Sequence, residues 1–519
     1  MTQATVTRRR GGRTARRAAH AAIPPATERP VHAGLEGGRY TPLTEGDLHA
    51  IHGAALEILE TVGLADPIPS CIELCTARGA RLNADGRLCF PRALVEDVIA
   101  AAARAFTLCA RDPGLDVLPR GRRVHFGTAG AAVHIVDARS GRYRDSTLAD
   151  LHDAARIVDV LEHLHLFQRP LVCRDIEDPF EMEINTLYAC LAGTRKHVGV
   201  SFGHPRQLAA ALPMLHLLAG SEAAFRARPF VSLSCCFVVP PLRFAEDACR
   251  CLEAAARAGL PVLLLAAGQA GATSPAALAG AVAQTMAEVL AGLVYLHCVV
   301  PGAPALLGPW PFVSDLRTGA MSGGSGEQAL LMAACARMGR FYDIPTGVAS
   351  GMTDSKICDQ QAGYEIGINH ALVANTGANI LYEAAGMRAS LLGFSFEGLV
   401  IDNDAIGAVL RTLRGLETDA DSLSVEVVRE VCTAGPGHYL GHPQTLDLMR
   451  RGYLYPVVGD RSSPGEWIER GSTTVLDRAI ALTEDILRRH RPRYIEPEID
   501  AEIRRRLPIR LPPAEKDRA

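Results

Sequence analysis

From about residue 147 onward, short apolar runs alternate with longer stretches whose apolar positions recur at helical spacing. Runs of strand length that alternate with helical patterns are typical of a parallel sheet with crossover helices. The predicted strands cover residues 166–172, 197–202, 230–238, 261–267, 305–308, 344–349, 378–382 and 399–402. About eight such units in roughly 300 residues favour a (β/α)8 TIM barrel over a doubly wound sheet.

The flanking segments predict three further regions. Residues 1–38 are rich in arginine and predict a disordered tail, with a polyanion-binding or targeting arm as the alternative. Residues 39–145 predict an N-terminal helical/β subdomain whose first helix begins at a capping box from Thr44 to Asp47. We expect the barrel over 146–470 and a C-terminal helix and tail over 471–519.

Helix boundaries are also indicated by single residues. Thr147 and Asp150 predict the start of one helix, and Thr474 predicts the start of another that ends near residue 489. A long apolar helix is expected over 275–298, with Ser274 as its cap. This stretch contains Gln284 and Glu288, which fits a core helix better than a membrane span.

Composition narrows the functional classes. Hydrophobic residues make up 48% and charged residues 21% of the 519 residues, as in ordinary globular enzymes. The net charge of −3 gives no general attraction to nucleic acid or anionic membranes. The 14 cysteines follow no regular framework, which indicates reduced thiols and a cytoplasmic protein.

The most informative polar segment is 351–365, with the sequence GMTDSKICDQQAGYE. It follows the predicted strand at 344–349, and (β/α)8 barrels carry their active sites at the carboxyl ends of the strands. So many polar groups beside buried strands need hydrogen-bond partners, because unpaired buried polar groups are costly. We therefore interpret the segment as an active-site loop.

Other strand ends carry further candidates. Trp310 follows the strand at 305–308 and is interpreted either as a pocket wall for a cation or as a packing residue of the rim. Carboxylates cluster after the later strands, and a site that faces carboxylates suits a cationic substrate or acid–base chemistry. From this cluster we select Glu365 and Glu397 as catalytic candidates; the alternative is that such acids are solvated or cap helices.

Several common motifs are absent from the sequence. No strand is followed by a dinucleotide-binding glycine signature, and the loop at 322–327 lacks the Gly-Lys-Ser/Thr of a P-loop. That loop fits a plain helix start, with a phosphate cradle as the alternative. No regular metal-ligand spacing occurs, although folding could still bring His297, Cys298 and Cys235 together as a catalytic zinc site.

Dispersed segments together resemble the trimethylamine methyltransferase family, which includes methyltransferases for glycine betaine and other quaternary amines. The segments are Asp145-Ser146-Thr147, Lys196-His197-Val198, Asp354-Ser355-Lys356, the stretch from Asp359 to Glu365, Gly377-Ala378-Asn379, Phe396-Glu397, Gly437-His438-Tyr439-Leu440 and Asp460-Arg461 with Trp467. The resemblance implies a (β/α)8 barrel. It also implies methyl transfer from an amine to the Co(I) of a separate corrinoid protein, with no tightly bound cofactor.

One departure from that family carries chemical meaning. The trimethylamine enzymes of the family contain pyrrolysine, whereas this chain has only standard residues. A quaternary ammonium leaves as a neutral amine and needs no special residue, so a quaternary substrate such as glycine betaine is favoured. An aromatic wall and carboxylates would hold the cation. For the carboxylate of a betaine the donor candidates are Lys356, Arg317 and His438.

The complete prediction is a methyltransferase that is a homo-oligomer and binds neither nucleic acid nor membrane. Its predicted substrate-binding residues are Trp310, Arg317, Asp354, Lys356, Tyr364 and His438, its catalytic residues are Glu365 and Glu397, and no metal is expected. Two alternatives stay open at this point. One is a zinc-dependent barrel methyltransferase, and the other is a betaine-binding relative that has lost turnover.

Overall fold

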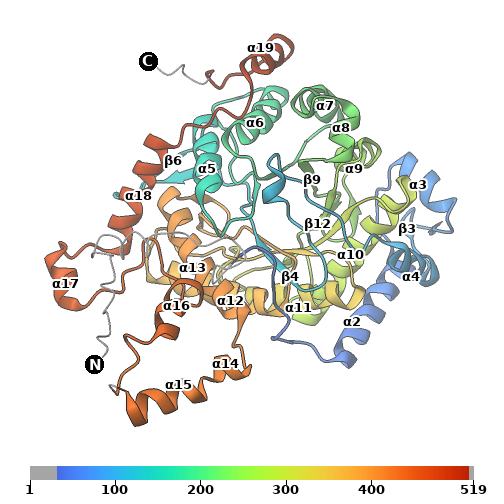
Figure 1. Ribbon diagram of the computed structural model, residues 1–519. Coiled ribbons are helices and arrows are strands. Elements are labelled where there is room, and N and C mark those ends of the chain that lie inside the picture. Colours follow the sequence, from blue (N-terminus) through green and yellow to red (C-terminus); the bar gives the residue numbers. More distant parts are fainter. Residues whose placement is uncertain (1–31, 436, 514–519) are drawn as a thin grey trace, which may run out of the picture. The chain divides into compact units, whose positions relative to one another are not determined.

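The computed structural model describes residues 32–435 and 437–513, which form an α/β fold (Figure 1). Most of the expected arginine-rich tail, residues 1–31, lies outside the described residues. Its last part was predicted wrongly, because β1 (Leu35–Glu36) is a strand that pairs antiparallel with β4 (Arg123–Phe126). The ordered chain therefore begins before residue 39.

Five parallel strands form one sheet. Its order is β14 (Ala305–Pro309), β12 (Val262–Ala266), β9 (Val231–Cys235), β8 (His197–Val200) and β7 (Leu166–Gln168). Every residue of these strands is buried, as expected for parallel strands that are covered on both faces. Four of these strands lie inside the predicted ranges, and β14 extends one residue beyond its range, to Pro309.

A second sheet contains three more parallel strands. β4, β17 (Ile380–Tyr382) and β16 (Gly347–Ala349) pair in that order. Single parallel bridges also join Gly127 to Leu166 and Leu307 to Thr346. Because β4 pairs with a strand more than 250 residues later, the expected start of the α/β region at residue 146 is too late. The apolar run that contains β4 belongs to the parallel strands.

The predicted strand at 399–402 is wrong. These residues lie in the helix α13 (Phe396–Arg414), where Leu399, Val400 and Ile406 are buried. A run of three apolar residues, here Leu399 to Ile401, fits a strand or a turn of a buried helix equally well. The surrounding apolar positions, which recur at helical spacing, decide for the helix.

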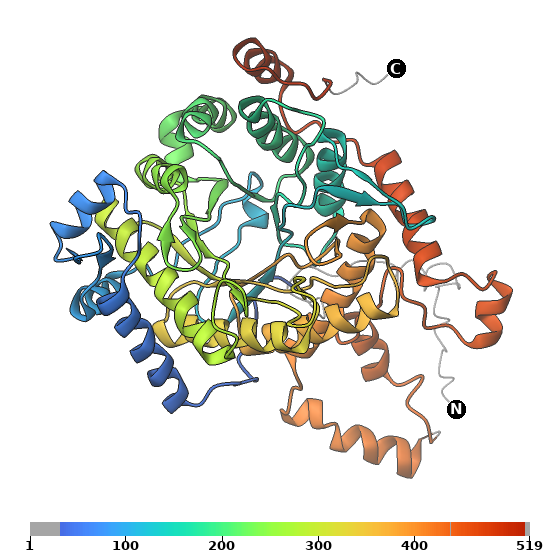
Figure 2. The ribbon, with the colours of Figure 1, turned by 180° about the vertical axis from the view of Figure 1, so that it is seen from behind.

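Helices surround the parallel strands (Figures 1 and 2). Those between and after the strands are α5 (Leu148–Val160), α6 (Pro179–Gly193), α7 (Pro205–Ala219), α8 (Glu222–Ala227), α9 (Glu246–Ala258), α10 (Leu278–Val299), α11 (Gly326–Tyr342), α12 (Gln360–Thr376) and α13. The N-terminal elements are α2 (Glu45–Glu57), α3 (Pro69–Thr76), the hairpin of β2 (Arg81–Leu82) and β3 (Leu88–Cys89), and α4 (Arg92–Ala101). α17 (Pro464–Glu469), α18 (Val475–Arg489) and α19 (Pro497–Arg506) follow near the C-terminus.

Capping explains several of these helix starts. Thr44, Thr147 and Thr474 each accept a hydrogen bond from the backbone three residues later, and the acid at that position bonds back to the cap. These reciprocal pairs satisfy two backbone donors each and confirm the predicted boundaries. The predicted cap at Ser274 is wrong, because α10 begins after Ala277 without a side-chain cap.

α10 is long and apolar enough to cross a membrane by composition alone. However, 89% of its most apolar window is buried inside the protein. Helices buried in this way are typical of protein cores, which agrees with the prediction of a core helix. Glu288, inside this helix, is fully buried and accepts hydrogen bonds from Leu242 N and Gln284.

The chain divides into two units. One comprises residues 1–32 and 410–455, and the described part of it carries α14 (Ala420–Leu423), α15 (Val425–Arg429) and α16 (Pro443–Arg451). The other comprises residues 33–409 and 456–519 and contains all of the parallel strands. The expected barrel range of 146–470 therefore includes a segment that belongs to a different unit.

Lys196 fixes the carboxyl end of α5. Its side chain is 5% exposed, and its ammonium group donates to the carbonyls of Val158, Leu161 and Leu164 at 2.6, 2.7 and 2.5 Å. The last carbonyls of a helix have no partner within the helix, and a cation there also complements the helix dipole. This side chain thus holds the end of α5 next to the start of β8.

Replacement of Lys196 by methionine (Lys196→Met) should lower the free energy of unfolding by about 2–4 kcal/mol, because it leaves buried carbonyls without donors. Urea unfolding followed by circular dichroism measures this change. The exposed Arg139, which pairs with Glu484 at the surface, provides the control Arg139→Met, for which we expect a loss below about 1 kcal/mol. Equal losses in the two variants would contradict the role assigned to Lys196.

Candidate functional site

The polar segment that follows β16 is held by hydrogen bonds to neighbouring loops. Asp354 accepts from Ser322 Oγ, from Gly323 N and from Ser390 Oγ, each at 2.7 Å. These partners come from the loops that follow β14 and β17. Asp354, predicted as a substrate ligand, therefore joins three loops at the carboxyl ends of adjacent strands.

Glu365 anchors the same segment from α12. Its Oε2 accepts from Thr353 Oγ1 at 2.5 Å and from Asp354 N at 2.8 Å, and its Oε1 accepts from Gln361 at 2.9 Å. A Cβ atom on Gly324 would lie 2.1 Å from Oε2, so the carboxylate is in close contact with the backbone of the loop after β14. Both oxygens are engaged, which is the arrangement of a residue that positions a loop. The predicted catalytic role of Glu365 stays a prediction.

Glu397, the second predicted catalytic acid, lies in the first turn of α13. It is half-buried and accepts a hydrogen bond from Ser395 Oγ at 3.2 Å. Burial raises the pKa of Glu397 above its usual range. This prediction is also untested.

The remaining polar candidates lie at the surface. Arg317 is 88% exposed and forms an ion pair with Asp315, and the ammonium group of Lys356 donates to Asp354 O. Tyr364 is an exposed residue of α12. His438 is exposed and belongs to the unit that contains residues 410–455. Four of the six predicted substrate ligands are therefore exposed rather than directed into the interior.

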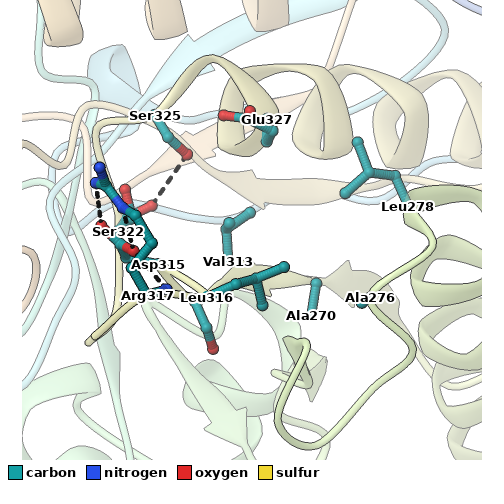
Figure 3. Close-up of a pocket in the computed structure, with 11 residues that line it drawn as sticks. Ala270, Ala276, Leu278, Val313, Asp315, Leu316, Arg317, Ser322, Ser325 and Glu327 are labelled. Carbon is teal, nitrogen blue, oxygen red and sulfur yellow. Dashed lines mark hydrogen bonds and ion pairs between the residues drawn. The ribbon is translucent and has the colours of Figure 1, made fainter. Parts of the chain in front are cut away.

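A cavity of about 510 Å³ lies beside the loop that follows β14 (Figure 3). Leu278 of α10 lies on one side and Ser325 and Glu327 of α11 on another, with Asp315 and Arg317 at the loop. Asp315 and Glu327 bring two carboxylates to the cavity, whereas Arg317 brings one guanidinium, which is already paired with Asp315. This charge balance disfavours the phosphate cradle that the glycine- and serine-rich loop leaves open as an alternative.

Trp310 belongs to an aromatic pair in the interior. It is 4% exposed, its indole N–H donates to Gly347 O at 2.9 Å, and its ring centroid lies 5.6 Å from that of Tyr382. A Cβ atom at Gly347 would lie 2.5 Å from the Tyr382 ring, so glycine is needed there. The pair joins the carboxyl ends of β14 and β17.

Glu383 directly follows Tyr382 and is the residue that sequence reasoning failed to select. It is 2% exposed, and its Oε2 has no hydrogen-bond partner in the described part of the chain. Burial alone raises the pKa of Glu383 to about 8. An unpaired buried acid at a strand end is typical of functional sites. The available signal was a glutamate placed immediately after an apolar strand.

Glu383 and Arg169 both influence the pKa of the thiol of Cys236, a residue that follows β9. Burial raises the pKa of the Cys236 thiol to about 11, with Arg169 lowering it and Glu383 raising it. Cys236 is nevertheless exposed to water. Arg169, Cys236 and Glu383, which follow β7, β9 and β17, therefore lie near one another at the carboxyl ends of the strands. We infer that these three residues line a recess.

The zinc alternative finds no support in the geometry. Cys235 donates to Ala248 O on α9, whereas Cys298 lies beside Cys75. Across residues 32–435 and 437–513, no three His, Cys, Asp or Glu side chains are grouped so that they could hold a metal ion. His297, Cys298 and Cys235 are thus not brought together as a ligand set.

Comparison with known proteins gives matches over most of the chain. The family model for trimethylamine methyltransferase (MTTB) matches residues 9–508. The chain is 31% identical to the trimethylamine methyltransferase MttB of Desulfitobacterium hafniense over 91% of its length and 94% of the relative. It is 30% identical to a glycine betaine methyltransferase of the same species over 90% of its length and 96% of the relative. A crystal structure of the Methanosarcina barkeri monomethylamine methyltransferase (MtmB) is 14% identical, with a TM-score of 0.46, over 87% of this chain and 95% of that chain.

The hydrogen bonds of Glu365 predict the effect of Glu365→Gln. One of its two oxygens becomes an amide donor, so a donor from Thr353, Asp354 or Gln361 loses its acceptor. We expect the free energy of unfolding to fall by about 1–3 kcal/mol, measured by urea unfolding. Thr353→Val, which removes one donor to the same oxygen, is the matched variant and should have a similar effect. Unchanged stability of Glu365→Gln would contradict the positioning role.

Proposed function

Because the chain belongs to the trimethylamine methyltransferase family, we propose that this methyltransferase demethylates a quaternary amine such as glycine betaine. The acceptor in this proposal is the Co(I) of a separate corrinoid protein. One observation carries the choice of a cationic substrate: Glu383, which directly follows Tyr382 of the aromatic pair in the chain, is a buried acid whose Oε2 has no hydrogen-bond partner among residues 32–435 and 437–513. Aromatic faces and carboxylates are the groups that bind quaternary ammonium ions.

We further propose that the parallel strands close into one (β/α)8 barrel. The bridge from Gly127 to Leu166 links β4 to β7, and the bridge from Leu307 to Thr346 links β14 to β16. With these links, β4, β7, β8, β9, β12, β14, β16 and β17 would follow one another in sequence order around a ring. In such a ring the recess at Glu383 lies at the face where barrels carry their active sites.

The chemistry of a quaternary amine fits the residues of this recess. When the methyl group passes to the acceptor, the C–N bond breaks and its electron pair remains on nitrogen. The product is a neutral tertiary amine, so no proton has to be delivered to the leaving group. The protein is required to orient the N–CH₃ bond and to exclude water. We propose that the buried rings of Trp310 and Tyr382 serve both tasks.

Exposed apolar side chains around the strand ends support docking of a protein partner. Val239, Leu316, Ile357 and Leu392 are exposed on loops that follow β9, β14, β16 and β17, and Tyr143 is exposed on the hairpin that follows β4. Clustered exposed apolar residues are typical of interaction surfaces. A corrinoid protein that docks there would present its cobalt to the recess. We also propose that the reaction takes place in the cytoplasm.

Methyl transfer can be tested directly with the purified protein. We expect glycine betaine, in the presence of a reduced corrinoid protein, to convert the Co(I) spectrum to that of methyl-Co(III). Trp310→Ala should lower kcat/KM by about 10-fold, since a desolvated cation–aromatic contact contributes about 1–2 kcal/mol. The chain's other tryptophan, Trp467, lies on α17 and is 37% exposed; Trp467→Ala is the matched control and should leave kcat/KM unchanged. No spectral change with any quaternary amine would refute the proposal.

A further inference from the structure

The backbone around Glu383 is fixed on both sides. Ser350 N donates to Tyr382 O at 2.8 Å, and Ala384 N donates to Gly127 O at 3.1 Å. Glu383 itself has a φ of 57°, a left-handed conformation that is uncommon for a glutamate. Strained residues of this kind persist where the surroundings hold them, and they concentrate at functional sites. The position of the carboxyl group is therefore set by the fold.

Buried His370 adds a third constraint. Burial lowers the pKa of His370 to about 4, so its ring is neutral near pH 7. One ring nitrogen lies 2.9 Å from Ala384 O and must donate to it, so the other accepts from Ser350 Oγ at 2.9 Å. The imidazole thus ties together the residues that follow β16 and β17. It supplies no positive charge to Glu383.

Among residues 32–435 and 437–513, no charged side chain forms an ion pair with Glu383, and burial alone raises its pKa. A buried carboxylate without a partner is costly, and it avoids this cost by keeping its proton. Cys236 does not change this, because burial keeps its thiol protonated, and burial alone, without a contribution from Arg169, raises the pKa of Glu383. Across the neutral pH range, Glu383 is therefore the group in this set that changes its charge.

We propose that Glu383 is the counter-ion of the substrate ammonium and that it gives up its proton as the cation enters the recess. This inference rests on the proposed function, because it takes a quaternary amine as the ligand. A quaternary nitrogen has no N–H group, so it cannot satisfy a carboxyl by hydrogen bonding and compensates it only by charge. Around the ammonium group, binding is then an exchange of one proton for one positive charge, and the carboxylate of a betaine brings its own negative charge in addition.

The exchange predicts a pH dependence with a definite sign. In the empty site the carboxyl group is protonated below pH 8, since burial raises its pKa to about 8. The affinity for the cation should therefore rise about tenfold per pH unit below pH ~8 and level off above it. Near pH ~7 the binding of one ligand should release close to one proton. At pH ~9.5 it should release almost none.

Titration calorimetry with glycine betaine in buffers of different ionisation enthalpy measures both quantities. The probe for charge recognition is tert-butylacetate, in which carbon replaces the quaternary nitrogen of glycine betaine. We expect wild-type protein to release a proton with glycine betaine and to bind tert-butylacetate at least about 10-fold more weakly. Binding that is independent of pH, or equal binding of the two probes, would overturn the inference.

Glu383→Gln separates the charge from the shape of the side chain. Glutamine imitates the protonated acid of the empty site, so we expect the variant to fold with unchanged stability near pH ~7. It should bind glycine betaine at least about 10-fold more weakly above pH ~8, without pH dependence and without proton release. The matched control is Glu288→Gln, because Glu288 is also buried, burial raises its pKa to about 7, and it lies inside α10. This control should keep the wild-type affinity and proton release.

The two proposals can fail separately, because binding is measured without any corrinoid. Proton-linked binding of glycine betaine without methyl transfer would refute the proposed reaction and leave the role of Glu383 standing. Methyl transfer with wild-type affinity in Glu383→Gln would refute the role of Glu383 and leave the reaction standing. If Glu383→Gln does not fold, Glu383→Asp, which keeps the charge on a shorter arm, should retain the proton release; its loss would overturn the inference.

Discussion

The cost of burying polar groups without partners governs the carboxyl ends of these parallel strands. Asp354 meets this constraint with three donors from two neighbouring loops, and Glu365 meets it with three donors from its own loop and helix. The same bonds hold the loops after β14, β16 and β17 against one another. The polar residues of segment 351–365 therefore hold the loops at the carboxyl ends of these strands in place.

These loops also explain why Glu383 can remain unpaired. The chain that follows Glu383 contains a buried ion pair. Arg388 lies 3.1 Å from Asp402, and both side chains are almost inaccessible to water. The fold thus supplies a full counter-ion to Asp402 while leaving Glu383 without one. A rigid surrounding is needed for this difference to persist, because a mobile carboxylate would turn toward a donor or toward water. Loops fixed by Asp354, Glu365 and His370 provide that rigidity.

Periodicity was enough to predict most of the strands, and the threonine–aspartate spacings located the starts of α2, α5 and α18. Prediction failed where the decision depends on distant partners. The strand β4 was placed in the wrong domain because its neighbour β17 lies more than 250 residues later. The prediction of a strand at 399–402 fails because the three apolar residues at 399–401 do not define a period. Among the site candidates, the position of Trp310 after a strand is visible in the sequence, whereas Glu383 depends on a left-handed backbone and on an Oε2 atom without a partner in the described part of the chain, which no local pattern encodes.

A neutral acid beside an aromatic pair selects its ligand by charge balance rather than by hydrogen bonding. An ammonium with N–H groups would be bound as well by any carbonyl acceptor, and it could transfer a proton to the site. In the binding that we propose, a quaternary ammonium would offer methyl groups to the rings of Trp310 and Tyr382 and a permanent charge to Glu383, and it would need no hydrogen-bond acceptor. The carboxyl group of Glu383, with its unpaired Oε2, and the hydrogen-bonded loops around it would then serve the same binding site. The loops fix the position of Glu383, and in our proposal the substrate ammonium supplies the positive charge that no protein side chain provides there.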